Sequence, residues 1–267
     1  MTKKTMSLVA VLLLVLSMGL LPAAAETEEN TIYVNIANAG KLEAAMEPIA
    51  LTDADGDGAL TVNDALILIH DAKYEGGAAA GFATADSQYG PMITKLWGVE
   101  NGGSYGYYVN NIMSMGLMDP VAAGNVVYAF VYADAAGFSD AYSYFDKSQA
   151  EIADGEELTL TLSKADGFDA NYAPIYKPLE GAVITVDGIA TQFVTDAEGK
   201  AIIKLEAGSH IVSATAGDTL LVPAVCAVTV QAAAAQASPA RTIGIILGIV
   251  VVIALIVVWM LKGKKKN

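Results

Sequence analysis

Cysteine and histidine are almost absent from this chain. Among its 267 residues there is one cysteine, Cys226, and there are two histidines, His70 and His210. A lone cysteine excludes an intramolecular disulfide, so cross-linking does not stabilise the fold. The scarcity also leaves few residues for a nucleophile–base pair or a catalytic metal site. H-E-x-x-H does not occur, and the one G-x-S-x-G match, at residues 102–106, has no histidine near it in the sequence. We therefore do not expect an enzyme, and we expect both histidines to be packed or surface side chains.

Basic residues are scarce between the two ends. Residues 26–241 hold nine Lys and Arg against all 29 Asp and Glu, a formal charge of −20. Nucleic acids and anionic lipids are bound through basic surface patches, so we expect neither as a partner. Such acidity is typical of a soluble exported protein, and it also suits a surface that collects cations.

Each end of the chain carries a long apolar run. Two lysines precede the apolar residues 8–21, and Ala23-Ala24-Ala25 fits a signal-peptidase site, which predicts a signal peptide over residues 1–25. Residues 243–261 are nineteen residues without a charge. As a helix they would be about 28 Å long, close to the roughly 30 Å of a bilayer core.

Four lysines follow that second run, in residues 262–267. Positive charge is retained on the cytoplasmic side, so the sequence predicts a single-pass protein of the plasma membrane with its C-terminus in the cytoplasm. The ectodomain would be extracellular. Residues 231–242, rich in Ala and Gln, are expected to form a linker between the ectodomain and the membrane.

The first part of the ectodomain, residues 26–150, mixes helical and strand periodicity. Residues 61–73 place apolar side chains at helical spacing and are expected to cover a sheet. Strand-like runs are Thr31–Ile36, Met46–Leu51, Met92–Val99, Tyr105–Ile112 and Val126–Tyr132, and the last is apolar on both faces like a central strand. We predict an α+β domain with one helix on a mixed sheet, and an irregular segment over residues 78–91.

The second part, residues 151–230, changes to a period of two. Leu158, Leu160 and Leu162 alternate with polar residues, and further short runs are separated by Gly- and Asp-rich turns. This spacing predicts an all-β sandwich. Asp196 and Glu198 lie in one such turn and are expected to be hairpin residues.

Residues 53–64 read D-A-D-G-D-G-A-L-T-V-N-D. Counted from Asp53, carboxylates fall at positions 1, 3, 5 and 12, and Gly58 occupies position 6. A twelve-residue calcium loop directs its oxygens inward from these positions. We predict a structural calcium site with these ligands: Asp53, Asp55, Asp57, the Ala59 carbonyl, Thr61 and Asp64.

A second interpretation of the same residues needs no metal. Thr61 as N-cap with Asp64 three residues later is a capping-box-like helix start.

The loop also resembles the half-hand of dockerin modules and related extracellular calcium loops. Its twelfth residue is aspartate rather than glutamate, and no clear helix enters it.

An aromatic and asparagine-rich segment follows the helix. Trp97 precedes the run Y-G-Y-Y-V-N-N at residues 105–111. Adjacent residues of a strand point to opposite faces, so Tyr107 and Tyr108 cannot both enter one core. The aromatics are either core side chains or a site in which rings stack on a ligand beside amides. The residues of that candidate ligand site are Trp97, Tyr107, Tyr108, Asn110 and Asn111.

The stretch from Thr31 to Asp146 resembles a domain of unknown function, DUF4430, related to the β-domain of transcobalamin and intrinsic factor. The likeness rests on the Trp-Gly strand at Trp97, the Y-V-N strand ending at Asn110 and the helix start at Thr61. It implies a β-grasp-like fold and, as in corrinoid-binding relatives, contact with a corrinoid-like ligand. The large helical domain of those carriers is missing from this chain.

Residues 179–210 resemble the carboxypeptidase-regulatory and Ig-like modules of bacterial surface proteins, which implies a stalk or spacer. We therefore expect a calcium-stabilised extracellular protein that presents its first domain to a small ligand. The alternative is a structural or adhesion protein that contacts another surface protein and binds no small molecule.

Overall fold

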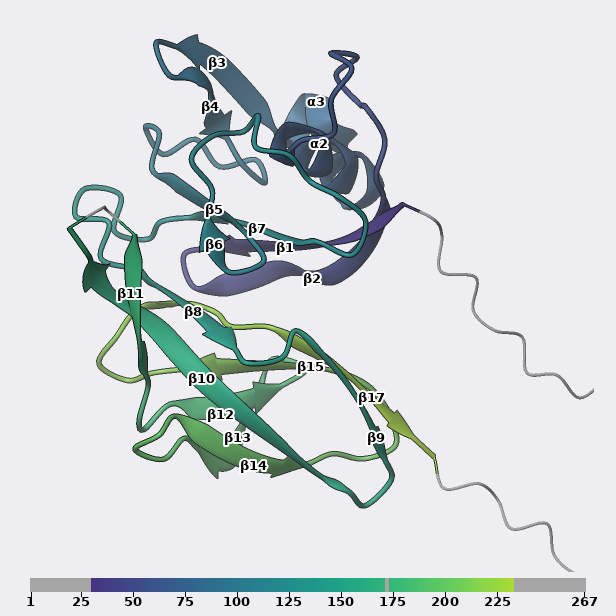
Figure 1. The fold of residues 1–267 in the computed structure, drawn as a ribbon, viewed down its shortest axis with the longest axis vertical. Helices are drawn as coiled ribbons and strands as arrows, with labels where there is room; N and C mark the ends of the chain where they lie inside the picture. The colour runs from purple at the N-terminus through teal and green to yellow at the C-terminus, as the bar shows by residue number, and fades with distance from the viewer. Residues whose placement is uncertain (1–29, 171–172, 233–267) are drawn as a thin grey trace, which may run out of the picture.

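The computed structural model describes residues 30–170 and 173–232. It shows two β-rich parts stacked on each other: the head, residues 30–132, and the sandwich, residues 141–231 (Figure 1). Within the described ranges, no helix has the length and apolar character to cross a membrane. The predicted signal peptide and transmembrane helix lie outside the described residues, as do the cytoplasmic tail and nearly all of the predicted linker.

The head is built on a five-stranded mixed sheet. Its strands run in the spatial order β2-β1-β7-β5-β6, with β1 and β7 parallel and every other neighbouring pair antiparallel. Their bounds are β1 (Thr31–Asn38), β2 (Lys41–Ala50), β5 (Tyr105–Val109), β6 (Ile112–Met113) and β7 (Val126–Val131). The predicted central strand is β7, because its apolar residues are buried on both faces.

The main helix, α2 (Val62–Lys73), covers one face of this sheet. Its apolar side chains pack with those of β1 and β7 in a core that includes Ile32, Leu66 and Ile69, all fully buried. This helix ends at Lys73, with Tyr74 as its C-cap in an extended conformation. A short helix, α3 (Gly77–Gly81), follows, and its N-cap is Gly76, which has a φ of 86°. A two-stranded hairpin of β3 (Ala83–Ser87) and β4 (Gly90–Lys95) projects beside the helices.

The sandwich consists of two sheets. One has the order β11-β10-β8-β16, with β14 also paired to β10, and the other has the order β13-β12-β15-β17-β9. Leu158, Leu160 and Leu162 all point into the core between them, so the predicted alternation is confirmed. The bounds are β8 (Ala141–Phe145), β9 (Gln149–Ala153), β10 (Glu157–Phe168), β11 (Pro174–Pro178), β12 (Val183–Val186), β13 (Ile189–Val194), β14 (Lys200–Lys204), β15 (Gly208–Thr215), β16 (Leu221–Val222) and β17 (Cys226–Gln231).

Three local predictions differ from the structure. The sandwich begins at Ala141 with β8, earlier than the predicted boundary at residue 151. The segment 78–91, expected to be irregular, contains α3 and most of the β3–β4 hairpin. The single strand predicted over Tyr105–Ile112 is two strands, β5 and β6, because Asn110 and Asn111 have φ angles of 50° and 64° and reverse the chain.

The face of the head sheet opposite α2 packs against the sandwich. Here Tyr108, Tyr128 and Phe130 of the head meet Tyr142, Val222 and Val225 of the sandwich in a third buried cluster. The hydroxyl of Tyr128 donates to the Pro223 carbonyl at 2.6 Å. The two parts therefore share a core, which fixes how they sit on each other.

Candidate functional site

Three carboxylates converge in the loop between β2 and α2. Oxygens of Asp53, Asp55 and Asp57 all lie within 4.8 Å of one another, and all three side chains are exposed. The loop lies on the side of the head away from the sandwich (Figure 1). The structure therefore brings together three of the six predicted calcium ligands.

Backbone N–H groups of the loop hold these carboxylates in place. Asp53 accepts from the N–H groups of Gly56 and Gly58 at 2.7 and 3.0 Å, and Asp57 accepts from Ala59 at 2.8 Å. Gly56 and Gly58 have φ angles of 78° and 90°, which residues other than glycine adopt only with strain. The carboxylates are thus positioned by the turn itself.

Asp64 lies under the loop and is fully buried. One of its oxygens accepts from the N–H groups of Ala54 and Asp55 at 2.7 and 3.3 Å, and the other accepts from the N–H and hydroxyl of Thr61 at 2.9 and 2.8 Å. Four donors and the N-terminus of α2 compensate a buried charge. The capping box that the sequence offered as the second interpretation is confirmed.

The donor set of this loop suits calcium. Calcium takes about six to eight hard oxygen ligands, and the loop gathers only oxygen donors. Oxygens of Asp53, Asp55 and Asp57 already converge at exposed positions, whereas the side chains of Thr61 and Asp64 bond to each other in the helix cap. Asn63 adds one unsatisfied group: its amide donates to Asp55 at 2.8 Å, while its buried carbonyl oxygen has no hydrogen-bond partner.

The aromatic segment is divided between the two faces of the head sheet. Tyr108 is buried against the sandwich, where its ring stacks on Tyr142. Tyr107 is partly buried against the core on the α2 side, and its pKa is raised by burial and by the Asp119 carboxylate. The two adjacent tyrosines therefore face opposite sides, as the strand periodicity predicts.

The two asparagines close the β5–β6 turn. Asn110 accepts from the Val126 N–H at 2.8 Å, and the Asn111 side-chain carbonyl accepts from the Tyr142 hydroxyl at 2.9 Å. The Asn111 backbone carbonyl accepts from Tyr176 at 3.0 Å. Both side chains line a cavity of about 160 Å³, which is smaller than the roughly 300 Å³ at which pockets for small-molecule ligands begin.

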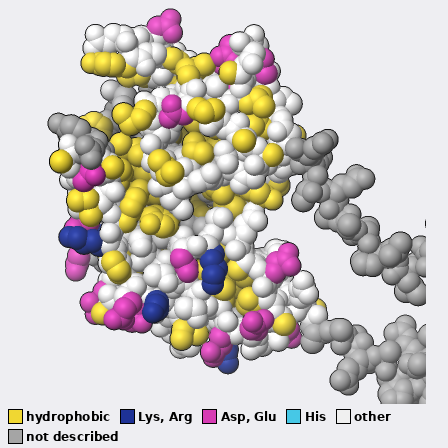
Figure 2. Space-filling model, in the orientation of Figure 1, with side chains coloured by type: hydrophobic (Ala, Val, Ile, Leu, Met, Phe, Trp, Pro, Cys, Tyr) yellow, Lys and Arg dark blue, Asp and Glu magenta, His cyan; other side chains and the backbone are white. Residues whose placement is uncertain are grey.

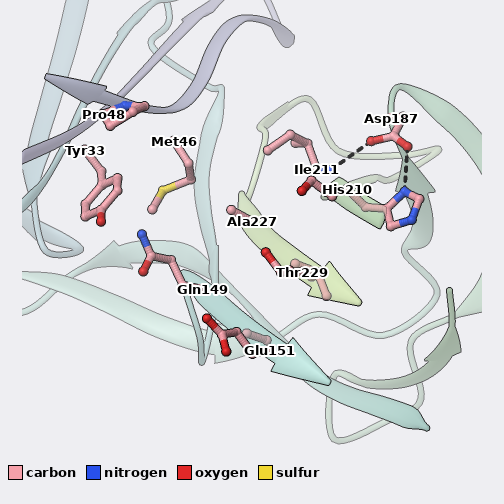
Figure 3. Close-up of a pocket in the computed structure, with 13 residues that line it drawn as sticks. Tyr33, Met46, Pro48, Gln149, Glu151, Asp187, His210, Ile211, Ala227 and Thr229 are labelled. Carbon is pink, nitrogen blue, oxygen red and sulfur yellow. Dashed lines mark hydrogen bonds and ion pairs between the residues drawn. The ribbon is translucent and has the colours of Figure 1, made fainter. Parts of the chain in front are cut away.

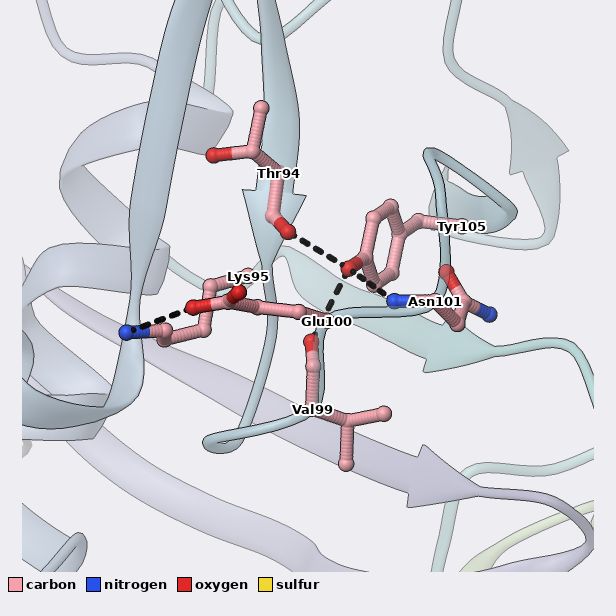
Figure 4. A network of polar contacts seen from close by, with 6 residues as sticks. All are labelled: Thr94, Lys95, Val99, Glu100, Asn101 and Tyr105. Carbon is pink, nitrogen blue, oxygen red and sulfur yellow. Dashed lines mark hydrogen bonds and ion pairs between the residues drawn. The ribbon is translucent and has the colours of Figure 1, made fainter.

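Trp97 lies apart from these residues, beside α2. Its ring packs on His70 and Tyr74 with centroids 5.0 and 5.3 Å away. The loop that carries it is tied down by the Tyr105 hydroxyl, which lies 2.8 Å from the Thr94 carbonyl and 2.9 Å from the Val99 carbonyl (Figure 4). The structure does not gather the five candidate ligand residues at one surface.

The two histidines and the cysteine are used in packing and in turns. Burial lowers the pKa of His70. Its Nε2 accepts a hydrogen bond from the Trp97 N–H, and its Nδ1 lies 2.6 Å from the Leu66 carbonyl oxygen. His210 bonds to the Asp187 carboxylate at 2.8 Å. Burial raises the pKa of the Cys226 thiol to about 12, so it is not a reactive thiolate.

A cleft at the junction of head and sandwich involves residues that the sequence did not single out. It has a volume of about 690 Å³, and its lining includes Tyr33, Met46, Gln149, Glu151 and Ile211. These residues come from strands β1, β2, β9 and β15, which are far apart in the chain. No local motif marks such a site, because only the stacking of the two parts assembles it.

No family model matches the chain, and no curated protein matches it in sequence. Among solved structures, the fibronectin(III)-like modules of CbhA from Clostridium thermocellum match with a TM-score of 0.26 and 20% sequence identity. That match covers 34% of this chain and 99% of the module. A TM-score at this level supports no argument about fold or function.

Proposed function

We propose that this chain is a calcium-braced extracellular binding protein, anchored in the plasma membrane by residues 243–261. The head would be a β-grasp-like, DUF4430-like domain. Its strand order β2-β1-β7-β5-β6, with a parallel central pair under one helix, supports that proposal. The sandwich would act as an Ig-like spacer that carries the head away from the membrane.

One observation carries the calcium part of the proposal: the convergence of Asp53, Asp55 and Asp57 within 4.8 Å. Like charges this close repel one another unless a cation lies between them. Asp64 joins the loop to the first turn of α2 through four hydrogen bonds. An ion held by the triad would therefore also fix the loop that covers the helix start, which is a structural role.

The aromatic segment by itself does not favour the small-ligand role, which stays a proposal. The side chains of Tyr108 and Asn111 are already in contact with Tyr142 of the sandwich, and Trp97 packs beside α2. A corrinoid-like ligand would have to use side chains that the fold has otherwise engaged. A ligand site elsewhere on the same two-part unit is more consistent with this geometry.

The adhesion alternative is favoured by one surface feature of the head. Ile112, Met115 and Met118 are 73%, 82% and 41% exposed in a short segment that begins at the edge strand β6. Hydrophobic side chains gather over the visible face of the head, whereas acidic ones are frequent over the sandwich (Figure 2). Clustered apolar exposure of this kind is typical of protein contact surfaces.

Isothermal titration of the purified full chain with calcium tests the metal site. We expect one ion per chain, with a dissociation constant on the order of 10⁻⁴ to 10⁻³ M, and no heat with the Asp53→Asn, Asp57→Asn double variant. The control is Glu180→Gln, Asp218→Asn, which removes the same charge from exposed positions of the sandwich. Calcium binding by the first double variant equal to that of the control would refute the site.

The location is tested separately by treating intact protoplasts with proteinase K. Residues 26–241 should be digested, while the lysine-rich C-terminus should be protected. Survival of the ectodomain would contradict the extracellular assignment, whatever the outcome of the calcium titration.

A further inference from the structure

The cleft between head and sandwich has two different walls. Tyr33 and Met46 descend from β1 and β2 of the head, and Gln149 on β9 of the sandwich points up at them (Figure 3). Pro48, Ile211 and Ala227 add apolar surface. The hollow is visible where the two parts meet (Figure 2). Its volume of about 690 Å³ lies in the range of small-molecule sites, which occur preferentially at domain junctions.

Several polar groups of the cleft are left without a protein partner. The Tyr33 hydroxyl, the Gln149 amide and the Thr229 hydroxyl bond to no other side chain in the described part of the chain. Each of these groups can both donate and accept a hydrogen bond. An apolar ligand would bury them unpaired, at a cost for each, so the cleft favours a ligand that is itself rich in donors and acceptors.

The charges of the cleft disfavour anionic ligands. Glu151 and Asp187 contribute carboxylates, and no lysine or arginine is among the described residues that line it. The single imidazole, His210, is occupied, because its two ring nitrogens lie 2.8 Å from Asp187 and 3.0 Å from the Glu206 carbonyl. A phosphate or carboxylate would therefore meet two carboxylates, and the one imidazole that could attract it is already paired with Asp187.

The two central strands on the floor of the cleft cannot pair with an extended peptide. Strands β15 and β17 form much of that floor, and each is already hydrogen-bonded to a strand on both sides. A peptide adds to a sheet through a free backbone edge, which these two strands do not offer. The free backbone edges near the cleft belong to β2 and β9, the outermost strands of their sheets. Over β15 and β17 recognition relies on side chains, and the flat Tyr33 ring offers a surface on which the C–H face of a sugar ring can pack.

From this geometry we infer that the cleft between β1–β2 of the head and β9–β15–β17 of the sandwich binds a neutral carbohydrate. Tyr33 packs against a sugar ring, and Gln149 and Thr229 hydrogen-bond its hydroxyls. The shared core behind the cleft holds both walls at a fixed separation, which reduces the entropic cost of binding. This inference rests on the extracellular binding role proposed above and gives that role a ligand class.

Saturation-transfer NMR on the purified full chain tests it, with maltotriose, cellotriose and N,N′,N″-triacetylchitotriose as probes at up to about 10 mM. At least one trisaccharide should bind. Tyr33→Ala should weaken that binding by about tenfold or more, and Gln149→Ala should weaken it by several-fold. The matched controls are Tyr89→Ala and Gln192→Ala, at exposed positions away from the cleft, and these should bind as the parent does.

Two results would overturn the inference: no transfer to any of the three sugars, or equal binding by the cleft variants and their controls. Gln149 is exposed, so Gln149→Ala keeps the test decisive even if Tyr33→Ala disturbs folding. Binding of an anionic or peptide probe that displaces the sugars would also refute the assigned class. The Asp53→Asn, Asp57→Asn variant should retain sugar binding, which separates failure of this site from failure of the calcium site.

Discussion

The rings of Tyr108 and Tyr142 lie parallel, with centroids 3.7 Å apart and 3° between their planes. Tyr108 belongs to the head and Tyr142 to the sandwich, and the Tyr142 hydroxyl also donates to Asn111 at 2.9 Å. Both rings are buried in the shared cluster. This pair makes the two parts one folding unit, because neither part can expose its ring without losing that packing.

Replacement of Tyr142 by alanine should uncouple the two parts. We expect a loss of about 3–5 kcal/mol in the free energy of unfolding, as for other buried aromatic residues, because the ring contacts and the bond to Asn111 disappear together. Differential scanning calorimetry should then show two transitions in place of one. The control is Tyr89→Ala, whose ring is 82% exposed and whose loss should cost under about 0.5 kcal/mol. A single, equally cooperative transition in Tyr142→Ala would contradict the shared core.

Replacement of Asp64 by alanine should destabilise the head whether or not calcium is present. The four donors that its carboxylate receives would lose their acceptor. We expect a cost of at least about 2 kcal/mol in a urea titration, and about 1 kcal/mol for Thr61→Ala, which removes only the cap hydroxyl. An effect of Asp64→Ala that vanishes in a calcium chelator would show that the cap has no role of its own.

The Asp187–His210 pair should make stability depend on pH. The hydrogen bond to Asp187 raises the pKa of His210 above its usual 6.5. Burial alone would raise the pKa of Asp187, but the bonds from His210 and the Ile211 N–H outweigh it and hold that pKa below its usual 3.8. The contribution of His210 to folding stability is complete below pH 6.5 and is lost as the pH rises through its raised pKa. The contribution of Asp187 to folding stability is present above pH 3.8 and is lost as the pH falls through its lowered pKa.

Thermal unfolding of the parent and of His210→Gln between about pH 4 and 9 measures this dependence. The difference in melting temperature should be largest near pH 5–6 and should shrink toward pH 9. His70→Gln is a useful contrast, because burial lowers the pKa of His70 and its contribution should instead weaken in acid. A difference for His210→Gln that grows with rising pH would have the wrong sign.

Local chemistry made the start of α2 predictable from the sequence. Thr61 and Asp64 carry the capping signal and the residues after them carry the helical period, all within one continuous stretch. The same holds for β7, whose residues are apolar on both faces. The alternation of Leu158, Leu160 and Leu162 marked the sandwich for the same reason.

Neither the boundary between head and sandwich nor the cleft could be predicted from local sequence. Strand β8 carries tyrosines like those of the head, and only its pairing with β10 and β16 assigns it to the sandwich. The aromatic segment was open to two interpretations because sequence periodicity cannot say what covers the outer face of a sheet. In the structure Tyr142 covers it. Tyr33 and Gln149 become neighbours across the cleft through the same stacking.

The most direct measurement of the central claim is the melting temperature of the full chain in 10 mM calcium and in chelator. With dissociation constants on the order of 10⁻⁴ to 10⁻³ M, the ion should add about 1.4–2.7 kcal/mol and raise the melting temperature by roughly 3–10 °C. The Asp53→Asn, Asp57→Asn variant should show no rise, whereas Glu180→Gln, Asp218→Asn should rise as the parent does. An equal rise in all three proteins, or none in the parent, would contradict a calcium-braced loop.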